Sequence, residues 1–99
     1  MKLRAGWKAH GRQWWYKPND YGFHCEAVLQ ITVHGCKLFE AHYEKMKPSG
    51  FRDVVAISQM RRFSTRDEAF DFCEKMYDLR MKIRNQDDWL KYQEEYEHV

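Results

Sequence analysis

The most regular hydrophobic pattern of the chain runs from residue 23 to residue 33. Every second position on one side of this stretch is apolar: Phe23, Cys25, Ala27, Leu29, Ile31 and Val33. The positions between them are mostly polar. Alternation with a period of two over this length predicts a half-buried antiparallel strand with one dry face and one mostly wet face. We therefore expect a fold organised around a sheet.

Four stretches are expected to form the strands of this sheet: 11–17, 23–34, 37–44 and 53–63. The first contains the aromatic run Trp14-Trp15-Tyr16, and the last contains the β-branched run Val54 to Ile57. Aromatic and β-branched side chains favour strands. Because neighbouring strand residues point to opposite faces, Trp14 and Trp15 should face opposite ways. Residues 1–10 fit either a first edge strand or a basic arm.

Two registers are open for the hairpin that reverses near His34-Gly35. A two-residue loop pairs Leu29 with Glu40 and would bury a carboxylate, whereas a three-residue loop pairs Leu29 with Ala41 and Ile31 with Phe39. The second register keeps apolar residues together on one face. We therefore expect the three-residue loop.

The rhythm changes to a helical one after the fourth stretch. Thr65 followed by Glu68 has the spacing of a capping box, and apolar residues then recur every three or four positions: Ala69, Phe72, Met76, Leu79 and Ile83. This pattern predicts an amphipathic helix over 65–84. Asp87 can cap a C-terminal helix over 87–99, so the end of the chain is either one bent helix or two.

These elements predict a single α+β domain over residues 1–99. An antiparallel meander of three to four strands should be packed on one face by one long amphipathic helix, with a C-terminal helical segment after it. The expected core consists of Cys25, Ala27, Leu29, Ile31, Phe39, Ala41, Val55, Ile57, Phe72, Met76 and Leu79.

Charge is distributed unevenly, although the net charge of the 99 residues is only +2. The first 17 residues carry five cations and no acid, whereas the last 14 carry five acids and only Lys91 as a cation. The three cysteines are an odd number without a C-x-x-C pair, which argues against a disulfide framework and for a reducing compartment. No apolar run reaches membrane-spanning length. We expect a cytoplasmic protein, in the host cell if the chain is phage-encoded, with no membrane contact.

Catalytic and metal-binding patterns are weak. His24 and His34 would lie roughly 33 Å apart on one strand at about 3.3 Å per residue, too far to share a metal ion. The local pair of His34 and Cys36 lacks an orienting third group. We therefore expect no metal, no cofactor and no enzymatic activity.

Two surfaces are candidates for binding. The basic and aromatic N-terminal residues could track phosphates and stack on bases: Lys8, Arg12, Trp14, Trp15 and Lys17. The competing interpretation places these tryptophans in the core and leaves the cations as solubilising charges. An acidic helix stripe could meet a basic partner, although a solvated helix face is its more common role: Asp67, Asp71, Glu74 and Asp78.

Apolar surface left over after one core is filled predicts a homodimer. The second sheet face carries Val28 and Leu38, and the C-terminal helix has an aromatic stripe of Trp89, Tyr92 and Tyr96. Such surface usually belongs to an interface. The same aromatic stripe is a candidate site for a protein partner.

The segment Phe63-Ser64-Thr65-x-x-Glu68-Ala69, in which a strand passes directly into a capped helix, resembles the small DNA-reading domains of phage integrase arms and AP2 factors. The likeness covers only this segment and carries over no site residues. In size, aromatic content and lack of a site motif, the chain is similar to small accessory proteins of phages and mobile elements, many of which inhibit a host nucleic-acid machine. We therefore expect a non-enzymatic inhibitor or regulator that binds a nucleic-acid-processing protein or complex. Direct DNA or RNA binding is the second hypothesis, and an enzyme of unrecognised type is the third.

Overall fold

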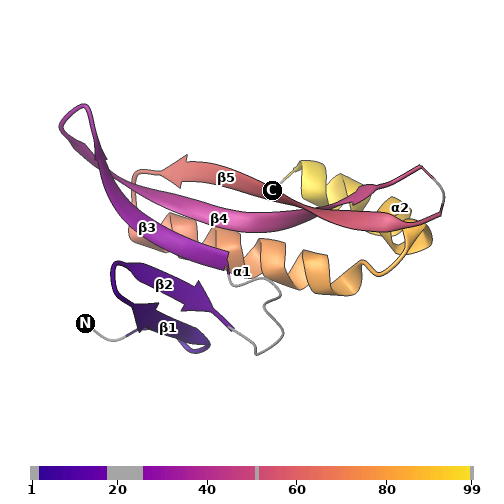
Figure 1. Cartoon of the computed structure of the whole chain (residues 1–99), viewed down its shortest axis with the longest axis horizontal. Helices are drawn as coiled ribbons and strands as arrows, with labels where there is room; N and C mark the ends of the chain where they lie inside the picture. The colour runs from indigo at the N-terminus through magenta and orange to yellow at the C-terminus, as the bar shows by residue number, and fades with distance from the viewer. Residues whose placement is uncertain (1–2, 18–25, 51, 99) are drawn as a thin grey trace.

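The computed structural model describes residues 3–17, 26–50 and 52–98, with only the backbone of residues 26–28. It is an α+β fold in which five antiparallel strands follow one another across one sheet in chain order, before two helices (Figure 1). The elements are β1 (Trp7–His10), β2 (Gln13–Tyr16), β3 (Glu26–Val33), β4 (Cys36–Pro48), β5 (Val54–Phe63), α1 (Arg66–Lys82) and α2 (Gln86–Glu97).

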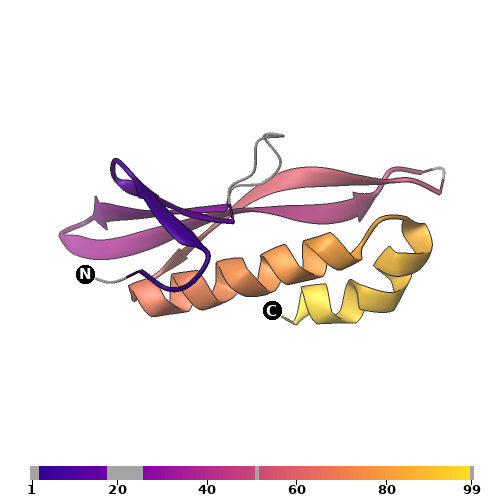
Figure 2. The ribbon, with the colours of Figure 1, turned by 90° about the horizontal axis from the view of Figure 1, so that it is seen from below.

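Helices lie on only one side of the sheet. In Figure 2 the strands β3, β4 and β5 form one layer, and α1 runs along it with α2 folded back beside α1. Among the described residues, no helix lies on the opposite face of these strands. This arrangement gives the sheet one covered face and one open face.

The sheet is larger than the sequence indicated. Residues 7–10 form β1, so the N-terminal segment is an edge strand, and a turn at Gly11 joins it to β2. β4 continues to Pro48, well beyond the expected end at residue 44. The expected strand over 23–34 is described from Glu26 onward, and residues 23–25 lie outside the described part of the chain.

The predicted register of the β3–β4 hairpin is wrong. His34 and Gly35 form a two-residue turn in which both residues have positive φ, 51° and 79°. This backbone matches the right-handed twist of the flanking strands, which is why two-residue hairpins favour it. Ile31 therefore pairs with Leu38, and Leu29 pairs with Glu40.

This one-residue difference turns the faces of β3 around. Phe39 packs against the core under α1, and its partner on β3 is Gln30. Paired residues share a face, so Leu29 and Ile31 lie on the face away from the helices, and their predicted place in the core is wrong. The side chains of Cys25 and Ala27, which were expected beside them, lie outside the described part of the chain.

The core lies between the covered face and α1. Its buried residues are Trp7, Tyr16, Ala41, Met46, Ala69, Phe70, Phe72, Cys73, Met76, Leu79, Ile83 and Tyr96. The predictions for Ala41, Phe72, Met76 and Leu79 are confirmed. Val55 is 45% exposed, so its predicted burial is wrong, and Ile57 is only partly buried.

Each helix begins at a polar cap. The backbone N–H of Glu68 donates to Oγ1 of Thr65 over 3.3 Å, which confirms Thr65 as the N-cap of α1. α2 is capped by Asn85, whose Oδ1 accepts from the N–H of Asp88 over 2.9 Å. The expected cap at Asp87 is therefore wrong by two residues. Extended backbone at Ile83 and Asn85 separates the two helices, which settles the choice between one helix and two.

Candidate functional site

The open face carries a group of apolar side chains that no described helix covers. We define the open-face patch as Trp15 of β2, Leu29, Ile31 and Val33 of β3, and Leu38 of β4. Each of these side chains is partly exposed. Ile31 and Leu38 are direct partners across the β3–β4 pair, so their side chains lie side by side. The patch thus spans three neighbouring strands.

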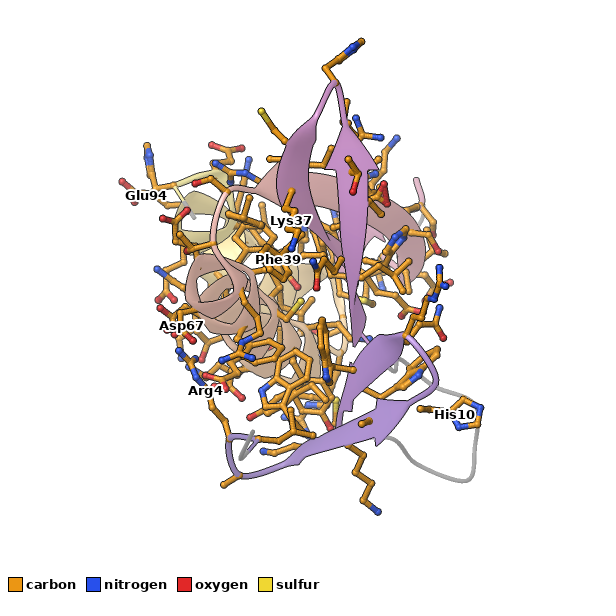
Figure 3. All side chains as sticks on the ribbon, turned by 90° about the vertical axis from the view of Figure 1, so that its left-hand side faces the viewer. Arg4, His10, Lys37, Phe39, Asp67 and Glu94 are labelled. Carbon is orange, nitrogen blue, oxygen red and sulfur yellow. The ribbon has the colours of Figure 1, made fainter. Side chains whose placement is uncertain are left out.

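Charged residues border this patch. Glu40 accepts from Arg62 over 3.4 Å and lies 3.3 Å from Nε2 of His42. Its side chain is only 13% exposed, so the carboxylate lies among its partners. Lys8 is the partner of Trp15 across the β1–β2 pair, and His10 on the same strand points away from the helices (Figure 3). The Glu40–Arg62 pair is neutral overall, so Lys8 is the cation that borders the patch beside Trp15.

Trp14 and Trp15 face opposite ways, as the alternation predicted. The ring of Trp14 meets Phe70 of α1 edge-on at 6.0 Å between centroids, on the covered face. Trp15 therefore lies on the open face, beside Lys8. Arg12 is exposed in the turn between β1 and β2.

The amino group of Lys17 lies over two tyrosine rings and not on the open face. Its amino group lies 5.2 Å from the ring centroid of Tyr16 and 5.4 Å from that of Tyr77. A hydrogen bond with Tyr16 raises the pKa of Lys17 above its ordinary value, and the charges of Tyr16 and Asp78 act in the same direction. Of the five predicted N-terminal residues, the structure brings Lys8 and Trp15 together, with Arg12 in the adjoining turn, and turns Trp14 and Lys17 toward the covered face.

The acidic stripe of α1 anchors the N-terminal segment. Arg4 lies 3.4 Å from Asp67, 2.5 Å from Asp71 and 3.5 Å from Glu74, and Figure 3 shows Arg4 beside Asp67. The indole N–H of Trp7 donates to Glu74 over 2.8 Å. The hydrogen bond to Asp71 raises the pKa of Arg4 above its ordinary value.

Sequence reasoning missed the roles of Arg4 and Trp7. The signal that could have found them was the match between an acid-free, basic N-terminus and an acidic helix stripe. Three of the four predicted acidic residues thus have partners inside the chain.

The aromatic stripe of α2 also packs within the chain. Tyr96 is 5% exposed, and the indole N–H of Trp89 donates to the carbonyl of Met46 over 3.1 Å. Tyr92 packs against the core, with the amino groups of Lys82 and Lys91 within 5.5 Å and 5.4 Å of its ring centroid. The expectation that these residues have no place in the core is wrong. Their predicted role as a partner site is correspondingly weaker than that of the open face.

Among the described residues, no three histidine, cysteine or carboxylate side chains form a group that could hold a metal ion. Cys36 is exposed and Cys73 is buried, while Cys25 lies outside the described part of the chain. Neither α1 nor α2 is long and apolar enough to cross a membrane.

Comparisons of the chain with protein-family models, with curated proteins and with solved structures found no match.

Proposed function

We propose that this chain is a non-enzymatic binding protein that docks a protein partner on the open face of its sheet. One observation carries the proposal: Leu29, Ile31 and Leu38 lie side by side on the face that neither α1 nor α2 covers. Large contiguous apolar patches with a polar rim mark interaction sites in soluble proteins. Fully burying an exposed leucine or isoleucine side chain contributes about 1.5–3 kcal/mol, and because these three side chains are already partly buried, each contributes a part of that to binding.

The charges around the patch indicate the chemistry of the partner. Lys8 borders the open-face patch, and the charges of Glu40 and Arg62 are matched within the chain. A partner with an apolar centre and a carboxylate opposite Lys8 would complement this surface, because opposite potentials favour association and suppress wrong partners. The hypothesis that this partner is a nucleic-acid-processing protein or complex, which the chain inhibits or regulates, stays a prediction.

A charge placed in the centre of the patch tests the proposal. Ile31→Asp puts a carboxylate beside Leu38, and Leu90→Asp is the matched control because Leu90 is 58% exposed on α2, away from the sheet. Circular dichroism first shows that each variant is folded. Wild type and both variants are then immobilised, and each is used to capture proteins from a lysate of the cells in which the chain is naturally produced. The proposal predicts a partner held by wild type and Leu90→Asp but lost by Ile31→Asp. An identical set of bound proteins on all three would contradict it.

Nucleic-acid binding is the second candidate, favoured by the pairing of Lys8 with Trp15 on the open face. An exposed aromatic face beside a cation can stack on a base and contact a phosphate. Arg12 in the adjoining turn would extend this site.

Fluorescence anisotropy with labelled single- and double-stranded oligonucleotides at two salt concentrations separates the two candidates. Nucleic-acid binding predicts salt-sensitive affinity that Arg12→Ala with Trp15→Ala abolishes. Arg84→Ala, at an 85% exposed cation in the link between α1 and α2, should leave it unchanged. Weak oligonucleotide binding that is the same in the Arg12→Ala, Trp15→Ala double variant and in Arg84→Ala would exclude nucleic-acid binding at this site.

A further inference from the structure

The outer edge of β5 is a long and unprotected strand edge. β5 pairs with β4 along Val54–Phe63, and no other strand among the described residues pairs with its outer side. Alternate residues of an edge strand point their N–H and C=O groups outward, which makes the edge a template for another strand. Figure 1 shows β5 as the last strand of the sheet.

The two edges of the sheet differ in how they are protected. β1 is only four residues long, carries Lys8, and has Trp7 N–H bonded to the carbonyl of Arg4. Short length and charge are devices that keep edges from pairing. β5 is ten residues long, and its segment Val54–Met60 has no charge, no proline and no glycine. Val55 and Met60 on this strand are 45% and 47% exposed.

The charges that flank this segment are self-complementary. Asp53 precedes Val54–Met60 and Arg61 follows it, so each lies four positions from Ile57. In an antiparallel pairing of two copies centred on Ile57, Asp53 of each copy lies opposite Arg61 of the other. Opposite charges in direct cross-strand positions are favourable, whereas like charges there are unfavourable. A parallel pairing in register would instead place Asp53 against Asp53.

We propose that β5 pairs antiparallel with β5 of a second copy of this chain, centred on Ile57, and joins the two sheets into one. The twofold axis of such a pair is perpendicular to the sheet, so the open faces of both copies lie on the same side. The proposed dimer therefore presents two open-face patches to a partner at once. The interface is distinct from the open face, so either proposal can fail without the other.

Charge reversal with rescue tests the interface. Sedimentation equilibrium over a concentration series measures the dimer Kd of wild type, Asp53→Arg, Arg61→Glu and the double variant. We expect wild type to reach about twice 12.2 kDa. Each single variant should weaken the dimer about tenfold or more, because like charges then oppose each other at two positions, and the double variant should return to within about threefold of wild type.

Glu95→Arg, at an exposed position of α2, is the control and should leave the Kd unchanged. A chain that stays at 12.2 kDa throughout would overturn the proposal and leave the edge for a strand of another protein. A dimer whose Kd is the same in wild type, Asp53→Arg, Arg61→Glu and the double variant would overturn the proposal as well.

Cross-linking tests the register directly. In a Cys36→Ser background, Ile57→Cys places two thiols on directly opposed residues, whose Cα atoms lie about 4.5–5.5 Å apart in an antiparallel pair. Val55→Cys is the matched control, because Val55 is opposed by Gln59 in this register and cannot reach its own copy. We expect rapid disulfide-linked dimer for Ile57→Cys only. Equal or faster linking of Val55→Cys would contradict the register.

Discussion

Both faces of the sheet carry apolar side chains, but only one face belongs to the core. On the covered face Ala41 is fully buried against α1, where Phe70 and Met76 are 2% exposed. On the open face Ile31 and Leu38 are partly exposed and touch no helix. The difference shows that apolar residues along a strand indicate a face that favours burial but do not indicate what covers it. Whether a helix of the same chain or another molecule covers it depends on register and topology.

The largest expected effect comes from the centre of the covered face. Phe70 contacts the rings of Trp7 and Trp14, with 4.2 Å and 6.0 Å between centroids. Phe70→Ala should lower the free energy of unfolding by about 3–5 kcal/mol, because the cavity forms in a fully packed site. Urea unfolding measures it. Leu38→Ala on the open face should cost clearly less, and equal losses would erase the distinction between the faces.

Overpacking should give the next largest effect. Ala41 has no exposed surface and lies directly under α1, so Ala41→Leu should lower the free energy of unfolding by about 1–3 kcal/mol. Ala9 on β1 is exposed, so Ala9→Leu is the matched control and should change stability by less than about 0.5 kcal/mol. Thermal unfolding of both variants checks this difference. A tolerated Ala41→Leu would mean that the helix does not pack on this face.

Much of the fold is legible in the sequence. The capping residue Thr65 and the apolar spacing of α1 predict that helix nearly to its ends, because both signals are local. The alternation along β3 also correctly identifies a strand. What it cannot specify is which side α1 covers, since that depends on pairing with β4. Placing Leu29 opposite Ala41 slipped the register by one residue, and a slip of one residue exchanges the two faces of a strand.

Two residues of the candidate site, Leu29 and Ile31, were therefore recognised as apolar but assigned to the core, whereas Leu38 was expected on the second face. Leu29 and Ile31 were expected inside, although the positive-φ pair His34-Gly35 favours the two-residue turn that places them outside. Trp89 and Tyr96 were expected on a surface, but their burial depends on α2 folding back toward β4. Contacts between residues so far apart in the chain leave no local trace in sequence periodicity.

Removing the N-cap of α1 should lower the stability of the fold without changing partner binding at the open face. Thr65→Ala removes the acceptor of the Glu68 N–H and should lower the free energy of unfolding by about 1 kcal/mol. Because the open face makes no contact with this cap, partner binding at temperatures where the variant is folded should not change. Urea unfolding and capture of the partner, both measured on Thr65→Ala and on wild type, test whether the two properties separate. Loss of binding in the folded variant would link the site to the helix side.

The smallest effect is expected at the N-terminal anchor. Arg4 is partly exposed, so Arg4→Met should cost no more than about 1 kcal/mol, and about 1 M salt should reduce the difference. The raised pKa of Arg4 means that its contribution is present below the ordinary pKa of arginine and is lost only as pH rises through the raised value. The difference between wild type and variant should therefore be constant across neutral pH. A stability difference that changed across neutral pH would mean that the titration of a group other than Arg4 contributes to it.

The orientation of β3 is the central claim, and a pair of aspartates tests it most directly. Equilibrium urea unfolding compares Ile31→Asp on the open face with Ala41→Asp on the covered face. Ile31→Asp should remain folded and lose less than about 2 kcal/mol, because its carboxylate stays in water. Ala41→Asp should lose more than about 4 kcal/mol or fail to fold, because it buries an unpaired charge. An Ile31→Asp variant that is destabilised as much as Ala41→Asp would contradict the account.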